Sequence, residues 1–279
     1  MTYGPAPWRQ RSWDWRAAAN FVGGGAGSGL IICTALAAPS DAPQAALFLA
    51  GTALIGLGLF CVWLEIGRPV RALNVFLNPF TSWMSREAVT ATLLVPAGLL
   101  AALGFAGTSW IAAAFAVVFV YCQGRMLRAA KGIPAWRDPA TPPLIVVTGL
   151  TEGAGLLVAV LAWMHGAAAA ASLAFAALLV VRAALWWAWR NNVRTHAAPR
   201  ALAAIDRTGR WLLLAGTAAP LVALVPALAT QGNAAAWLPA VAGLLAAGTG
   251  ALFKFDLLGG AAFNQGFALS HLPVRGVRR

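Results

Sequence analysis

Long apolar runs alternate with short polar links along almost the whole chain, and each run is long enough to cross a bilayer as a helix. A helix needs roughly 20 residues to span about 30 Å of hydrocarbon. The pattern predicts an all-α integral membrane protein with eight transmembrane helices and no soluble domain, so that residues 1–279 form a single transmembrane domain. The predicted spans are residues 17–38, 44–66, 86–106, 109–127, 143–164, 168–189, 211–230 and 235–256.

The lengths of the links predict that the spans pair as four hairpins. Short links near residues 39–43, 107–108, 165–167 and 231–234 join the two helices of each hairpin, and longer links join one hairpin to the next. Nineteen of the twenty Lys and Arg residues are assigned to the termini, to the longer links or to the helix ends beside them, and only Arg182 to a span interior. Lys254 is counted with the C-terminal end. Because Lys and Arg are enriched in cytoplasmic loops, both termini are expected in the cytoplasm.

The composition agrees with this class: 60% of the residues are hydrophobic, 10% are charged, and the mean hydropathy is +0.74. A net charge of +12 favours nucleic-acid binding in a soluble protein, where basic residues neutralise phosphates. Here the basic residues mark one face of a membrane protein, and no nucleic-acid partner is expected. The polar start, residues 1–16, lacks the early apolar segment and cleavage site of a removable signal peptide.

No metal site is expected in the chain itself. The three cysteines lie in separate apolar runs and form no Cys-x-x-Cys motif, which argues against an iron–sulfur cluster or a zinc site. The three histidines lie in a hairpin turn, a link and the tail, so no pair of axial ligands for a membrane haem is available within the spans.

Two carboxylates flank the second link near the predicted cytoplasmic interface. Glu65 ends the second span and Glu87 opens the third, with Trp83 between them. Capping is one explanation for Glu87, because a carboxylate is favoured in the first turn of a helix. Arg68 lies three residues after Glu65, a spacing that allows it simply to neutralise that residue. Two acids beside arginines and a tryptophan nevertheless exceed what topology requires, and they are candidate proton carriers.

Glu152 and Arg182 are the two ionisable residues predicted to lie deepest. Glu152 lies about 14 Å into its span and Arg182 about 12 Å into the next, at 1.5 Å per residue. An ionisable group at such depth is by default a functional hypothesis. Since the two spans form one hairpin and the depths match, we expect a buried ion pair; the alternative is that each faces a water-filled cavity separately.

Several motifs taken together resemble the membrane anchor subunit of dimethyl sulfoxide reductase and its relatives, the haem-free, polysulfide-reductase-like, quinone-reactive subunits. The motifs are Glu65-x-Gly67-Arg68-Pro69, Ser82-Trp83-x-Ser85-Arg86-Glu87, and Pro134-Ala135-Trp136 followed by Thr148-Gly149-Leu150. The resemblance implies a multi-pass subunit of the bacterial cytoplasmic (inner) membrane. Such a subunit exchanges electrons between the quinone pool and the iron–sulfur subunit of a molybdenum oxidoreductase. It is not expected to be active without its partner subunits.

The resemblance also assigns roles to residues. Glu87 matches the family's glutamate near the quinone site, and Glu65 stands where many relatives have histidine, so both are expected to act in catalysis. The expected quinone-binding residues are Arg68, Trp83, Arg86, Glu87, Glu152 and Arg182, and the expected docking residues are Arg71, Asn74, Trp136 and Arg137. The implied cofactors are a menaquinone or ubiquinone at the membrane face, with iron–sulfur clusters and molybdopterin only in the partner subunits and no haem.

The charge distribution orients the expected complex. The face that carries the motifs is the positive face, so the soluble partners are expected in the cytoplasm, as in relatives that oxidise sulfite or phenylacetyl-coenzyme A and reduce quinone in respiration. The segment 263–276 is similar to the phenylacetyl-coenzyme A branch. A purely structural anchor and a secondary transporter are the alternative functions; a transporter is expected to show broken helices in inverted repeats.

Overall fold

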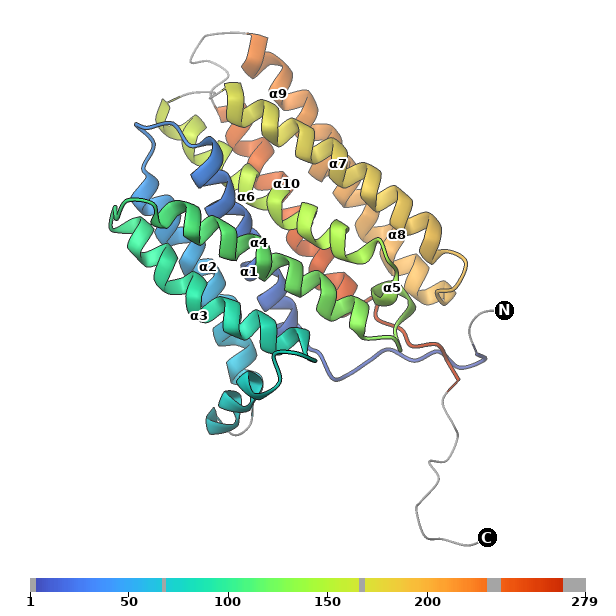
Figure 1. Ribbon diagram of the computed structural model, residues 1–279. Coiled ribbons are helices and arrows are strands. Elements are labelled where there is room, and N and C mark those ends of the chain that lie inside the picture. The colour runs from blue at the N-terminus through green and yellow to red at the C-terminus, as the bar shows by residue number, and fades with distance from the viewer. Residues whose placement is uncertain (1–3, 67–68, 166–168, 230–236, 268–279) are drawn as a thin grey trace, which may run out of the picture.

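The computed structural model describes residues 4–66, 69–165, 169–229 and 237–267, and these residues form a helical bundle (Figure 1). The elements are α1 (Trp15–Ala37), α2 (Gln44–Glu65), the 3-10 helix η1 (Pro69–Leu77), α3 (Trp83–Ala102), α4 (Thr108–Ala129), α5 (Pro134–Arg137), α6 (Thr141–His165), α7 (Ala169–Val193), α8 (Pro199–Leu213), the π-helical turn η2 (Leu214–Ala218), α9 (Ala219–Ala229) and α10 (Trp237–Leu258). The described part of the chain has no strand, only one isolated bridge, so the all-α prediction is confirmed.

Seven helical stretches in the described part of the chain are long and apolar enough to cross a membrane. They are α1, α2, α4, α6, α7, the continuous run from α8 into α9, and α10. The third predicted span, α3, is not among them, since its first two turns carry Arg86 and Glu87 and these charges lower its hydropathy. The protein is therefore a multi-pass membrane protein, while an eighth crossing and the four-hairpin arrangement stay predictions.

Helices α1, α6 and α10 form the centre of the bundle, and glycine allows them to pack closely. A methyl group on Gly149 of α6 would lie 2.9 Å from the carbonyl oxygen of Gly25 on α1. A methyl group on Gly155 of α6 would lie 2.7 Å from the carbonyl oxygen of Gly243 on α10. Small residues favour helix association in lipid because they let backbones come close. Helices α2, α3 and α4 pack on one side of this centre and α7, α8 and α9 on the other (Figure 1).

The two ends of the described chain meet at one end of the bundle. The Gly4 amide donates to the Gln265 carbonyl at 2.6 Å, and Arg9 forms an antiparallel bridge with Phe263. The short helix α5 is buried at the same end, where the Trp136 indole nitrogen donates to the Leu257 carbonyl at 2.8 Å. The two chain ends and the α4–α6 link at this end are therefore packed structure rather than open loops.

The helix that contains the start of the seventh predicted span, 211–230, begins earlier, at Pro199. The link that carries Arg200, Arg207 and Arg210 is therefore an amphipathic helix, and its apolar face recurs at helical spacing. The buried residues of α8 are Ala201, Ala204, Ile205, Thr208, Gly209 and Leu212. Charge alone is thus a poor sign of a helix end where an apolar stripe continues.

Two glycines of α10 make a matched test of the close packing. Gly243→Ala should destabilise the protein by about 1–3 kcal/mol, because its methyl group meets the backbone of Gly155 and overpacking has costs of this order. Gly248→Ala on the same helix should be neutral or slightly stabilising, since nothing lies within 4 Å of the added methyl group. Thermal unfolding of the detergent-purified variants measures both; equal losses of stability at the two positions would contradict the assignment.

Candidate functional site

A cavity of about 290 Å³ lies between the starts of α1 and α3 and the ends of α2 and α4. Its lining is mostly apolar, with two carboxyl groups and one amide. The lining residues are Trp13, Ala17, Asn20, Phe21, Val62, Glu65, Ile66, Met84, Glu87 and Met126. The structure thus brings together the two predicted proton carriers, which are 22 residues apart in the sequence, in one cavity.

Glu87 lies in the first turns of α3, and its side chain is buried at 6% exposure. The helix is capped by Ser82, whose hydroxyl accepts from the Ser85 amide at 3.4 Å, so Glu87 is not needed as the cap. Its carboxyl accepts a hydrogen bond from the Asn20 side-chain amide at 3.1 Å and forms no ion pair with any described residue. A neutral carboxylic acid is far less costly to bury than an isolated carboxylate. The group is therefore suited to exchanging protons.

Glu65, the last residue of α2, is half-buried where the cavity meets the interface. Arg16 lies close to this helix end, since its guanidinium donates to the Leu64 carbonyl at 3.0 Å. The same guanidinium also forms an ion pair with Asp14, the N-cap of α1, with 2.7 Å between its nitrogen and the carboxylate oxygen. The hydrogen bonds from Arg16 hold the pKa of Asp14 below its usual value. Arg16 is thus held by other groups beside the cavity and is not one of its lining residues.

Trp83 and Arg86, both predicted to bind quinone, lie outside the lining of the cavity. The guanidinium groups of Arg86 and Arg125 lie over the Trp83 ring, 4.2 and 4.4 Å from its centroid. Arg86 also donates to the carbonyl groups of Pro79 and Phe80 at 2.8 and 2.7 Å. These contacts hold the segment before α3 in place, so Trp83 and Arg86 support the position of Glu87 rather than contact the cavity. Arg68 lies outside the described residues.

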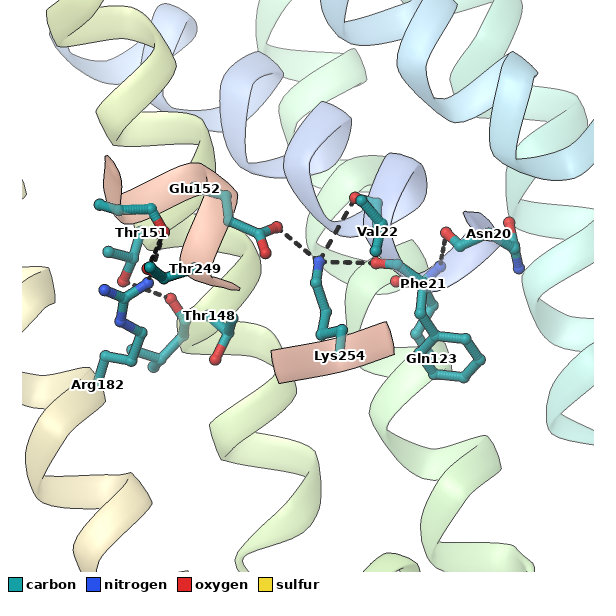
Figure 2. A network of polar contacts seen from close by, with 12 residues as sticks. Asn20, Phe21, Val22, Gln123, Thr148, Thr151, Glu152, Arg182, Thr249 and Lys254 are labelled. Carbon is teal, nitrogen blue, oxygen red and sulfur yellow. Dashed lines mark hydrogen bonds and ion pairs between the residues drawn. The ribbon is translucent and has the colours of Figure 1, made fainter. Parts of the chain in front are cut away.

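The predicted ion pair between Glu152 and Arg182 is wrong. Glu152 pairs instead with Lys254 of α10, with 2.6 Å between Oε2 and Nζ, and both side chains are fully buried (Figure 2). The Lys254 ammonium also donates to the carbonyl groups of Phe21 and Val22 on α1, at 2.7 and 3.4 Å. Lys254 was counted with the cytoplasmic end, two residues before the predicted end of its span. The helix continues to Leu258, which places Lys254 inside.

Arg182 is fully buried on the far side of Glu152 from Lys254 and binds backbone carbonyl groups (Figure 2). It donates to Ala246 at 3.0 Å and to Gly216 in the π-helical turn η2. Gly216 lies four residues before Pro220, which has no N–H with which to continue the helix. Arg182 therefore supplies an N–H donor where the proline has none. These hydrogen bonds to the backbone give it a structural role.

Buried polar groups contact α1 at two places. Asn20 donates to Glu87 at the cavity. The next two residues, Phe21 and Val22, accept from Lys254 at the ion pair (Figure 2). The structure therefore separates Glu152 and Arg182 from the cavity that holds Glu65 and Glu87. Asn20 was missed by sequence reasoning, although an amide in the interior of an apolar span is itself a signal.

The predicted docking residues are placed differently from one another. Arg71 and Asn74 are exposed on η1, whose surface also carries the exposed apolar side chains Val70, Leu73 and Leu77. Trp136 of α5 is buried at 3% exposure and packs in the core, so it offers no surface to a partner. Arg137 beside it is half-buried and donates to the Lys131 carbonyl at 3.4 Å.

Comparison with known proteins identifies one family. The family model described as DMSO reductase anchor subunit (DmsC) matches residues 44–208. No curated protein matches the chain. The matched region runs from α2 through most of α8 and contains Glu65, Glu87, Glu152 and Arg182. Two of their partners, Asn20 on α1 and Lys254 on α10, lie outside it.

The ion pair can be tested by a double-mutant comparison. Lys254→Met should destabilise the protein by about 3–5 kcal/mol, because it leaves the buried Glu152 carboxylate without its ion-pair partner. The double variant E152M/K254M should recover most of that loss, since neither charge then remains buried. Thermal or denaturant unfolding in detergent measures the difference. A double variant as unstable as K254M would show that the pair is not the source of the loss.

Proposed function

The chain belongs to the family of DMSO reductase anchor subunits, and we propose that the cavity between α1, α2, α3 and α4 is its site for quinone. Family membership makes it the membrane anchor of a complex with a molybdenum catalytic subunit and an iron–sulfur subunit. The observation that supports a quinone role most directly is the buried carboxyl of Glu87, which faces an apolar cavity and accepts a hydrogen bond from an amide. A structural anchor needs no such group.

The cavity suits a quinone head group in size and character. Small-molecule pockets of about 300–1,000 Å³ are typically apolar with a few polar groups that fix orientation. The ring of a quinone can pack against Phe21, Met84 and Met126, while its oxygens require a partner that donates or accepts protons. Glu87 and Asn20 provide a proton carrier and a hydrogen-bond donor at the buried end, and Glu65 lies where the cavity meets the interface.

In the proposed reaction the partner subunits supply two electrons and the quinone takes up two protons to become quinol. Glu87 donates a proton to one ring oxygen as the electrons arrive, and Glu65 replenishes protons from the aqueous side. General acid–base steps of this kind contribute roughly 10²–10⁴-fold to rate. The reverse sequence of steps oxidises quinol. Quinone reduction coupled to a sulfite- or phenylacetyl-coenzyme A-oxidising partner is the direction we favour, with menaquinone or ubiquinone as the substrate.

The orientation follows from the charge distribution and from the paired chain ends. The pairing of Gly4 with Gln265 at one end of the bundle favours an even number of membrane crossings, and we assign α3 as the eighth crossing. The same end carries most of the basic residues and is taken as cytoplasmic by the positive-inside rule. The soluble subunits then dock on the cytoplasmic face of a bacterial inner membrane, over η1 with Arg71 and Asn74, and beside Arg137.

Glu87→Gln is the direct test of the proton carrier. The variant should lower quinone-dependent turnover of the purified complex by at least about 100-fold, because the amide cannot exchange the proton. Assembly of the subunits and turnover with a soluble dye that bypasses quinone should be unchanged. Arg128→Gln, an exposed residue of the last turn of α4, serves as the control and should retain full quinone turnover. Wild-type turnover in E87Q with a quinone analogue would overturn the assignment.

Ala17→Phe tests the location of the site independently of proton transfer. The added ring should fill part of the 290 Å³ cavity and raise the KM for quinone at least about tenfold, with the dye assay unaffected. Leu64→Phe, which adds a ring at an exposed residue beside Glu65 that does not line the cavity, is the control. Loss of co-purified quinone in A17F but not in L64F gives a second measurement. An unchanged KM and quinone content in A17F would place the site elsewhere.

A further inference from the structure

A second cavity, of about 490 Å³, lies on the other side of α1 at the same end of the bundle. It is bounded by the segment before α1, the first turn of α1, the end of α10 and one side of α8. Three arginines line it: Arg9 and Arg11 on the N-terminal segment, and Arg207 on α8. None of these three arginines lines the cavity proposed for quinone.

The N-terminal arginines are held in place by the chain end. The Gln10 amide donates to the Ala262 carbonyl at 2.9 Å, and the Asn264 amide to the Trp8 carbonyl at 3.0 Å. The Gln10 side chain also donates to the Leu258 carbonyl at the end of α10, at 2.9 Å. These contacts fix the segment that carries Arg9 and Arg11 against α10. The two arginines, two residues apart, therefore stay over the cavity.

The positive charge of the cavity is not fully neutralised within the described part of the chain. Of its two carboxylates, Asp14 is bound by Arg16 at 2.7 Å, and Asp256 lies 3.6 Å from Arg207. Arg9 and Arg11 are exposed and form no ion pair with a described residue. The cavity thus presents two guanidinium groups that form no ion pair with a described residue, and their planar donors suit phosphate oxygens. Arg9 also lies close enough to Asp256 to interact with it electrostatically.

An apolar stripe leads from this cavity along the outer surface of α10. Phe255 and Trp15, which line the cavity, are 48% and 56% exposed. Further along α10 the exposed apolar residues are Leu252, Leu245, Leu244 and Val241. From position 255 to position 241 the stripe is about 21 Å long at 1.5 Å per residue, comparable to the depth of one leaflet. A basic pocket at the end of such an apolar stripe matches the head group and acyl chain of a phospholipid.

We propose that this cavity binds one anionic phospholipid, with the phosphate between Arg9 and Arg11 and an acyl chain along the α10 stripe. Basic pockets between transmembrane helices on the cytoplasmic side are typical sites for anionic head groups. Trp15 lies at the level of the head groups, where tryptophan is enriched. The site joins the chain ends to α10 and so stabilises the end of the bundle at which the soluble subunits dock. The assignment does not depend on quinone binding.

Native mass spectrometry of the delipidated full chain, with any subunits that co-purify, tests the site. Phosphatidylglycerol should bind the wild-type protein in preference to phosphatidylcholine. R9Q/R11Q should weaken phosphatidylglycerol binding by roughly 25-fold, since each arginine near an anionic surface contributes about 1 kcal/mol, or about fivefold. R9K/R11K, which keeps the charge, should retain most of the binding. R128Q/R200Q, which removes two exposed arginines elsewhere, is the matched control and should bind as the wild type does.

Four results would overturn the proposal. Equal losses in R9Q/R11Q and R128Q/R200Q would mean that the lipid senses only net charge. Equal binding of the two lipids by the wild type would remove the role of the head-group charge. Displacement of the lipid by inorganic phosphate at the same concentration would show a site for free phosphate. Lipid bound by the chain alone but excluded once the soluble subunits are present would show that the arginines are a protein-docking surface.

Discussion

The close approach of α1, α6 and α10 is the constraint on which the rest of the structure depends. Glycine at the contact positions lets three backbones come together, and little room is left for side chains between them. What fills that space is the Glu152–Lys254 ion pair, which lies against Gly250 and Gly25 and binds two carbonyl groups of α1. Larger side chains at those glycines would displace the pair. The packing of the centre and its one buried ion pair are therefore a single arrangement.

The structure uses its buried carboxyl groups in two different ways. Glu152 has a cation beside it and a fixed position between three helices, which suits a structural role. Glu87 has an amide as its partner and an apolar cavity beside it, which suits a role in proton exchange. Both depend on α1, through Asn20 in one case and Phe21 in the other. The fixed centre thus also positions one wall of the candidate quinone site.

Much of this arrangement was predictable from apolar periodicity, and the failures have physical causes. The long apolar runs gave most of the helices, and the positions of Glu65 and Glu87 at facing helix ends predicted that they meet. Glu152 was correctly expected to be buried, but matching depths within one hairpin could not identify its partner, since a third helix supplied Lys254. Lys254 was missed because a lysine near the end of a span normally reaches the interface.

The candidate site differs from the predicted one because of contacts that only the folded chain creates. Trp83 and Arg86 are close to Glu87 in sequence, yet helix geometry turns them toward Arg125 and the preceding loop. Trp136 has the residue type of a docking side chain, but α5 folds inward and buries it. The helical start of α8, by contrast, has a local signal, because its apolar residues recur at helical spacing from Ala201 to Leu212. No local pattern in the sequence distinguishes the outcomes for Trp83, Arg86 and Trp136.

The Glu152–Lys254 pair has a consequence for the biosynthesis of the protein. The two residues are 102 positions apart, so the translocon receives Glu152 well before the ribosome has made Lys254. Inserting a charged residue at the centre of a helix costs about 3 kcal/mol on translocon scales. Until α10 is inserted, α6 must therefore tolerate a protonated carboxyl or stay beside the translocon. Helix α10, the last helix in the described part of the chain, completes the core, so a chain that lacks it leaves Glu152 without its partner at the centre of the bundle.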